Sequence, residues 1–279
     1  MCRMFIMIGA SEAVDRARDS MITSLVNAAK KDPYGQALFG GTEISHRDGW
    51  GWVALHLGSR GTALHFGRST APIYEDPSIN TPRSVSLLPG GKAALMIHAR
   101  AASRGMPINI FSTHPVETTT SNGYRLFLIH NGSVDKEELL RILNIDPRSN
   151  EAKIYNDTYF LAQYMAKKIS RDIDLSIIHE AVRLTKTALN IGVVLIKEQE
   201  AWVAVGSFYK AKDDEVRRNY YKIYRGKTQD LVIYSSSTLI DFYKPNIDIE
   251  WEELENGRFE IYRISGEKIE MVGSEIIKI

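Results

Sequence analysis

The sequence predicts an α+β fold in which sheets are covered by helices. Segments typical of strands dominate the first part of the chain, segments with helical spacing follow, and strand-like segments then return. This order differs from the regular strand–helix alternation that predicts a parallel sheet. The 279 residues can bury a sizeable core, which allows one large domain or at most two.

The first predicted elements are a strand over Cys2 to Ile8 and a helix over Glu12 to Lys31. In the helix, apolar residues recur at spacings typical of one helical face. A glycine-rich stretch, Gly35 to Gly41, follows. The next predicted strands are Trp50 to Leu57, Thr62 to Arg68, Lys92 to His98 and Tyr124 to His130, with loops over Pro72 to Pro89 and Ala101 to Asn122.

Helices are predicted next. Asp135 followed by Glu138 is typical of a capping box and predicts a helix over Lys136 to Leu143. Asn156 or Asp157 can cap a helix that runs to about Ile169. The remaining predicted elements are a helix over Leu175 to Ala188 and strands over Ile191 to Ile196, Ala201 to Val205, Tyr220 to Tyr224, Leu231 to Ser235, Arg258 to Arg263 and Lys268 to Val272.

Composition and charge exclude several classes of function. The 35 basic and 34 acidic residues nearly balance, which favours neither a nucleic-acid partner nor disorder. No apolar run reaches the length of roughly 18 residues that predicts a membrane span, and we expect no membrane partner. The one cysteine, Cys2, cannot form an intramolecular disulfide, so we expect a reducing, cytoplasmic location.

Cys2 is the first candidate catalytic residue. If Met1 is removed, Cys2 carries both a thiol and a free α-amine, whose ordinary pKa near 8 leaves a useful fraction neutral. That amine can take the thiol proton, so one residue supplies nucleophile and base. A buried thiol without a function would also fit this position.

Three further polar clusters follow predicted strands or precede a helix. Asn131 and the Gly132 N–H could donate together to a developing oxyanion, although an Asn-Gly pair is also typical of a turn. Arg100 could bind a carboxylate bidentately, or form a structural ion pair. Asp157 at a helix N-terminus could bind an ammonium, or only cap the helix.

Five motifs in order resemble those of class II glutamine amidotransferases. They are Met1-Cys2-Arg3, His46-Arg47-Asp48-Gly49-Trp50-Gly51, His98-Ala99-Arg100-Ala101, Thr113-His114-Pro115 and His130-Asn131-Gly132. The set is most similar to the stand-alone branch, in which the glutaminase domain is the whole protein. The resemblance is strong from Cys2 to about Phe160 and weaker beyond.

The resemblance implies a four-layer αββα N-terminal-nucleophile hydrolase sandwich of two antiparallel sheets, formed by one glutamine amidotransferase domain over residues 1–279. It implies Cys2 as the nucleophile and Asn131 with Gly132 as the oxyanion hole. It also implies that Arg100 binds the substrate α-carboxylate and Asp157 the α-amine. Arg47 and its neighbours would shape the pocket near the Cys2 amine.

Three positions depart from the family pattern. Ala101 and Ser103 stand where many members have Trp and Thr, and Arg104 stands where some have His. The Ser103 hydroxyl can still bind substrate, but the loop lacks a large aromatic lid. These departures change the side-chain end of the pocket more than the recognition of the amino-acid head group.

The predicted reaction is hydrolysis of the glutamine side-chain amide through a Cys2 thioester, releasing glutamate and ammonia, with no cofactor and no metal. The expected partners are glutamine or a γ-glutamyl small molecule, and a separate acceptor or synthase protein. One alternative is a γ-glutamyl amide or peptide hydrolase that releases an amine. Others are a silent binding module and a metal protein using His46, His98, His114 and His130, whose spacing matches no compact zinc motif.

Overall fold

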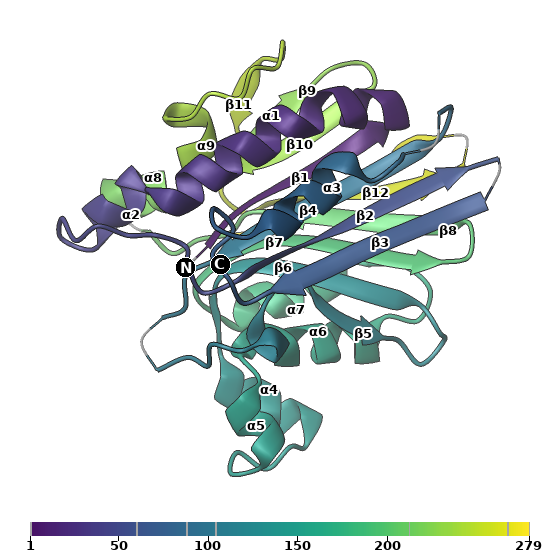
Figure 1. Cartoon of the computed structure of the whole chain (residues 1–279). Coiled ribbons are helices and arrows are strands. Elements are labelled where there is room, and N and C mark those ends of the chain that lie inside the picture. Colours follow the sequence, from purple (N-terminus) through teal and green to yellow (C-terminus); the bar gives the residue numbers. More distant parts are fainter. Residues whose placement is uncertain are drawn as a thin grey trace.

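The computed structural model describes residues 2–59, 61–87, 89–103, 105–211, 213–266 and 268–278 (Figure 1). Two antiparallel sheets stack face to face in it. The first has the strand order β11 (Trp251–Glu253), β9 (Ile223–Lys227), β10 (Leu231–Ser236), β1 (Cys2–Ala10), β4 (Lys92–Arg100), β2 (Trp50–Gly58), β3 (Gly61–Ser69). The second has the order β13 (Ile269–Ile276), β12 (Arg258–Ser265), β8 (Glu200–Gly206), β7 (Thr185–Lys197), β6 (Arg125–Val134), β5 (Val116–Thr119).

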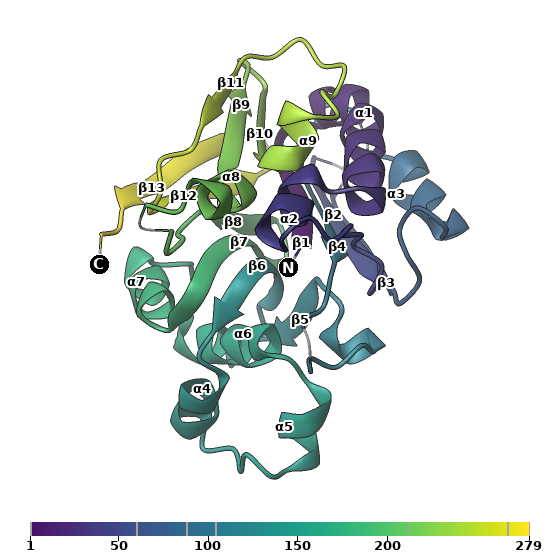
Figure 2. The same cartoon turned by 90° about the vertical axis from the view of Figure 1, so that its left-hand side faces the viewer.

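Helices cover the outer face of each sheet, as Figures 1 and 2 show. The long helix α1 (Ser11–Lys30) crosses the seven-stranded sheet beside α3 (Asn80–Ser84) and α9 (Ser237–Asp241). The short helices α2 (Pro33–Leu38) and α8 (Glu215–Tyr221) pack on each other. Below the six-stranded sheet lie α4 (Lys136–Leu143), α5 (Asn150–Ile154), α6 (Asp157–Lys168) and α7 (Leu175–Arg183). The predicted α+β class and the αββα sandwich are confirmed.

Strand β1 shows why the sheets are buried on both faces. Met4, Ile6 and Ile8 pack between the two sheets, whereas Phe5 and Met7 pack under α1. Successive side chains of a strand alternate between faces, so both sets are apolar. Complete burial of such a side chain contributes roughly 1.5–3 kcal/mol. By the same alternation, Cys2 faces the space between the sheets.

Strand β6 is longer than predicted, and Asn131 and Gly132 lie inside it. Asn131 pairs with Asn190 of β7, Gly132 pairs with Leu189, and a bulge follows before Val134. The polar Asn131 remains in the ladder because its backbone pairs with β7. The glycine adopts φ 146°, which permits the irregular backbone. The expectation that these residues follow the strand is therefore wrong.

Two other predicted elements have wrong limits. The helix predicted over Leu175 to Ala188 ends at Arg183, because Thr185 already pairs with Val134 as the start of β7. The strand predicted over Tyr220 to Tyr224 begins only at Ile223, as β9, because Tyr220 and Tyr221 end helix α8. The Asp214 side chain caps that helix by accepting from the Arg217 N–H. In both places tertiary pairing or a cap overrides local preference.

Several short elements lie in stretches without a predicted element. They are α2, α3, α5, α9, β5, β11 and the 3-10 turns Pro77–Ile79 and Ile110–Ser112. Each has too few residues for a periodic pattern to be recognised. Within the described ranges, no helix combines the length and apolarity needed to cross a bilayer.

Candidate functional site

Cys2 is the first residue of β1 and lies beside Arg100, the last residue of β4. The two are directly paired in the antiparallel ladder, so their side chains share the face between the sheets. Cys2 is 5% exposed and Arg100 is 4% exposed. The motif at the end of β4 thus places a cation next to the predicted nucleophile.

Asn131 approaches Cys2 from the opposite sheet. The Cys2 N–H donates to Asn131 Oδ1 at 3.0 Å. The other end of this amide, Nδ2, is buried and has no hydrogen-bond partner among the described residues. A buried donor without a partner is costly in a folded protein. Nδ2 is therefore a donor without a partner in the described structure, although Asn131 itself does not line the pocket that contains Cys2.

Gly132 follows Asn131 where β6 turns away from regular pairing. Its φ of 146° lies in a region that disfavours other residues, and a Cβ placed there would lie 1.9 Å from the Ala188 carbonyl oxygen. Only glycine fits this position. Gly132 lines the pocket that contains Cys2, as the oxyanion-hole prediction requires.

The Arg100 guanidinium is only partly satisfied. Nη2 donates to the Pro107 carbonyl at 2.9 Å, while Nη1 is buried without a partner in the described structure. Asp48 forms two hydrogen bonds with the chain at the end of β4. Asp48 N–H donates to the Arg100 carbonyl at 2.9 Å, and Asp48 Oδ2 accepts from Ala102 N–H at 2.7 Å. Asp48 therefore orders the loop after Arg100, a role that sequence reasoning missed.

Asp157 is the first residue of α6 and is 5% exposed. Its Oδ2 accepts from the Val134 N–H at 2.9 Å and its Oδ1 from the Thr158 N–H at 3.0 Å. A carboxylate oxygen can accept more than one hydrogen bond. Asp157 can therefore also bind an ammonium, and its backbone contacts fix its orientation. Asn156 is the residue that caps α6, through the Tyr159 N–H.

One small pocket unites most of the predicted site residues. Cys2, Arg100, Gly132 and Asp157 line it, and Ser103 lies at its exposed side. Its free volume is about 40 Å³, small beside the roughly 300–1,000 Å³ of typical ligand pockets. Met1 and Arg104 lie outside the described residues.

Arg47 is not brought into this pocket. Its side chain is exposed and it is absent from the pocket lining, although its neighbour His46 is fully buried. His46 Nε2 lies 2.8 Å from Asp32 Oδ2, and Asp32 also binds Arg3. These neighbours support the chain just behind Cys2, on the face of β1 turned away from the pocket.

Three histidines form a buried cluster behind Cys2. His114 Nδ1 lies 3.1 Å from His98 Nε2, and the rings of these two residues are 4.3 Å apart between centroids. His130 Nδ1 contacts the Thr158 hydroxyl at 3.0 Å. Neither this cluster nor any other part of the described chain assembles three or more candidate ligands as a metal site would. Burial, more than the neighbouring charges of His98 and Arg100, lowers the pKa of His114.

The Cys2 thiol is in an environment that favours its anion. Burial alone would raise its pKa, but interactions with His98, the N-terminal amine and Arg100 outweigh burial, and the thiol pKa falls well below its ordinary value. Lowered thiol pKa values are typical of reactive cysteines.

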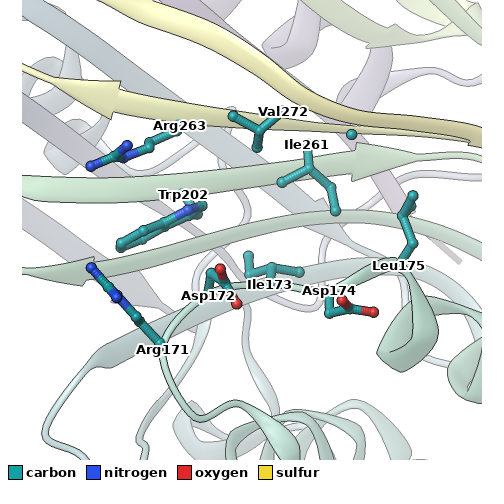
Figure 3. A pocket seen from close by; sticks show the side chains of 10 residues that line it. Arg171, Asp172, Ile173, Asp174, Leu175, Trp202, Ile261, Arg263 and Val272 are labelled. Carbon is teal, nitrogen blue, oxygen red and sulfur yellow. The ribbon is translucent and has the colours of Figure 1, made fainter.

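A larger hollow on the outer side of the six-stranded sheet lies around Trp202, Arg171 and Arg263 (Figure 3), and none of the predicted site residues line it.

The fold is similar to that of proteins with solved structures. The glutamine phosphoribosylpyrophosphate amidotransferase of B. subtilis, complexed with ADP and GMP, aligns with a TM-score of 0.55 and 19% identity. A structure described as the allosteric regulatory enzyme of purine biosynthesis aligns with a TM-score of 0.54 and 18% identity. Each alignment covers 99% of this chain and 49% of the other, so the chain spans about half the length of those proteins. No protein-family model and no curated protein matches the sequence. At this identity the likeness establishes the sandwich fold that the motifs imply.

Proposed function

We propose that this protein is a glutamine amidotransferase-type amide hydrolase whose nucleophile is Cys2 after removal of Met1. The observation that carries the proposal is the convergence of Cys2, Arg100, Asn131 and Asp157. They come from β1, β4, β6 and α6 and meet at one end of the sandwich. A cation, an anion, a thiol and a donor pair are the groups that hydrolysis of a glutamine amide requires.

The unpartnered nitrogens favour this function over a silent scaffold. Arg100 Nη1 and Asn131 Nδ2 are both buried without partners among the described residues. A protein selected only for stability gains nothing from leaving two donors unpaired. A bound α-carboxylate would satisfy Arg100 Nη1, and the oxyanion of a tetrahedral intermediate would satisfy Asn131 Nδ2.

In the proposed reaction, the thiolate of Cys2 forms a bond from Sγ to the carbonyl carbon of the side-chain amide, and the π electrons of the carbonyl move to its oxygen. Asn131 and the Gly132 N–H hold this oxyanion. The α-amine of Cys2, in its protonated form, gives a proton to the leaving nitrogen, the C–N bond breaks, and ammonia departs. Water then attacks the γ-glutamyl thioester and releases glutamate, and the amine accepts the proton of that water. Ser103 would contact substrate at the exposed side of the pocket.

The test is glutamine hydrolysis by the mature protein and by Cys2→Ser. We expect glutamate release from the mature protein and its loss in the variant, with an unchanged melting temperature, since Ser is close to Cys in size. Cys2→Ser is expected to retain the N-terminal amine if Met1 is removed, which mass spectrometry checks. Equal activity of the two proteins would refute the assignment.

A second candidate is a γ-glutamyl amide or peptide hydrolase that releases an amine. The small side chains of Ala101 and Ala102 line the pocket beside Ser103, where a large aromatic residue would restrict a leaving group bigger than ammonia. The comparison of kcat/KM for glutamine and for γ-glutamyl dipeptides separates the two candidates. Ammonia transfer to an acceptor would need a separate protein, and a glutamine-dependent reaction with that protein would identify it.

A further inference from the structure

His98 lies behind Cys2, and the proposed reaction leaves it unused. It is fully buried on β4. In the ladder of β1 and β4, Cys2 pairs with Arg100 and Met4 pairs with His98. The side chains of Cys2 and His98 therefore lie diagonally on one face, a separation that a long side chain can span. Nδ1 of His98 has no hydrogen-bond partner in the described part of the chain.

The contacts of the other ring nitrogen, Nε2, indicate which nitrogen of a neutral His98 carries the proton. His98 Nε2 is 3.2 Å from the His130 carbonyl oxygen, which can only accept. It is also 3.1 Å from His114 Nδ1, and this atom accepts from the His130 N–H at 3.4 Å. A proton on His98 Nε2 satisfies all three contacts. Nδ1 of a neutral His98 then carries a lone pair.

The opposite proton arrangement satisfies fewer contacts. It would let Asn156 Nδ2 donate to His114 Nε2 at 3.3 Å and His114 Nδ1 donate to His98 Nε2. It would also set the His130 carbonyl against a lone pair and the His130 N–H against another N–H. Asn156 does not need this contact, since its Nδ2 already donates to the Ser112 carbonyl at 3.1 Å.

Charged and titratable groups surround Cys2 and His98. They are Arg100 on β4, His114 before β5, His130 on β6, Asp157 on α6 and the α-amine. Burial lowers the pKa of His114. Burial also lowers the pKa of His130, against the charge of Asp157. Burial therefore disfavours a proton on either of these two histidines.

We propose that Nδ1 of His98 takes the thiol proton of Cys2, so that the α-amine is free to serve the leaving group. The inference rests on the proposed function for the later steps only. The S–H bond breaks, its electron pair stays on Sγ, and the proton forms an N–H bond at Nδ1. His98 keeps this proton through the cycle. The α-ammonium protonates the leaving nitrogen, and the resulting amine then takes a proton from the attacking water. The C–S bond breaks, its electron pair returns to Sγ, and the thiolate–imidazolium pair is restored.

The experiment measures the rate at which iodoacetamide alkylates Cys2 in the mature full-length protein as a function of pH. His98→Gln retains an N–H that can donate to the His130 carbonyl but removes the base at Nδ1. We expect the alkylation midpoint to rise by at least about one pH unit and the rate at about pH 6 to fall roughly tenfold. His56→Gln is the matched control, because His56 is also buried but lies on β2 outside the site.

An alkylation profile of His98→Gln that superimposes on the wild-type profile would overturn the inference. This readout does not depend on glutamine turnover, so a protein without glutaminase activity would refute the proposed function and leave the His98 result interpretable. If His98→Gln does not fold, the imidazole ¹⁵N chemical shifts of wild-type protein alkylated at Cys2 report which nitrogen of His98 carries the proton, and this result tests the inference. The expected state is neutral His98 with its proton on Nε2, and a proton on Nδ1 would contradict the inference.

Discussion

Asn131 is the residue whose role is tested most simply by substitution. Asn131→Ala removes Nδ2, the buried donor without a partner. Loss of one oxyanion donor typically lowers kcat by about 10²–10³-fold. We expect that loss with little change in KM, measured by steady-state glutamate release. A large rise in KM at constant kcat would instead assign Asn131 to ground-state binding.

Arg100 and Asp157 are predicted to affect substrate binding. Arg100→Lys keeps the charge but loses the planar pair of donors, and Asp157→Asn loses the charge that attracts an ammonium. We expect KM to rise by about tenfold or more in each, since a charged hydrogen bond contributes roughly 1.5–3 kcal/mol. A substrate analogue without the α-amine checks the assignment, because Asp157→Asn should affect it much less than it affects glutamine.

At the residue scale, the sequence identified the groups that carry distinctive chemistry. Cys2, Arg100, Asn131 and Asp157 could be proposed because each belongs to a motif or a helix start. Asp48 could not, since its importance depends on a contact with Ala102 that no spacing encodes. The partner of His98 Nε2 is likewise a backbone carbonyl in the other sheet.

The element that places the candidate oxyanion hole is β6, and Gly132 tests it. Gly132→Ala would bring a Cβ to 1.9 Å from the Ala188 oxygen at φ 146°. We expect the free energy of unfolding to fall by at least about 3 kcal/mol, because backbone on both strands must shift. Urea denaturation followed by circular dichroism measures this loss.

Gly123→Ala is the matched control for that substitution. Gly123 also has a positive φ, 80°, but an added Cβ would meet nothing within 4 Å. Its cost is therefore confined to backbone strain of about 1–2 kcal/mol. Equal losses in the two variants would show that the close approach of β6 and β7 is not what restricts position 132.

At the element scale, long periodic segments were predictable and junctions were not. Helix α1 and strands β2, β3 and β4 are found within a few residues of their predicted limits. The junction of α7 and β7 was misplaced because residues 184–188 are governed by pairing with β6, which is distant in sequence. The same pairing carries β6 past Asn131, where local preference predicts a turn.

A buried ion pair joins distant parts of the whole molecule. Arg3 binds both oxygens of Asp32, at 2.8 and 2.9 Å, and donates to the Tyr220 carbonyl at 2.8 Å. Asp32 also accepts from Thr238 Oγ1 at 2.7 Å. β1, α2, α8 and α9 are thereby connected on the side of β1 opposite the pocket. Arg3→Met should cost roughly 3–5 kcal/mol, since it leaves a buried carboxylate unpaired.

The buried ion pair of Arg3 and Asp32 predicts how the free energy of unfolding depends on pH. Burial alone would raise the pKa of Asp32, but the charge of Arg3 and the His46 contact hold it well below its ordinary value. The stabilisation is therefore present above about pH 4, the ordinary range of an aspartate, and is lost as the pH falls further. Chemical denaturation between about pH 5 and pH 2 measures the slope. A slope equally steep in Arg3→Met would mean that other groups cause it.

At the scale of the whole molecule, the order of strands and helices predicted the α+β class, and the motifs implied the sandwich. Neither could predict the strand order of the two sheets, because it is set by which apolar faces pack on each other. The register that pairs Cys2 with Arg100 was also beyond local patterns. That register is the physical basis of the candidate site.

The measurement that tests the central claim most directly is the intact mass of the purified protein before and after treatment with an electrophilic glutamine analogue. We predict a mass lacking Met1, then the addition of one label that peptide mapping assigns to Cys2. Excess glutamine should protect Cys2, and Arg100→Lys should weaken the protection. A retained Met1, or a Cys2 that stays unlabelled while the protein still hydrolyses glutamine, would contradict the account.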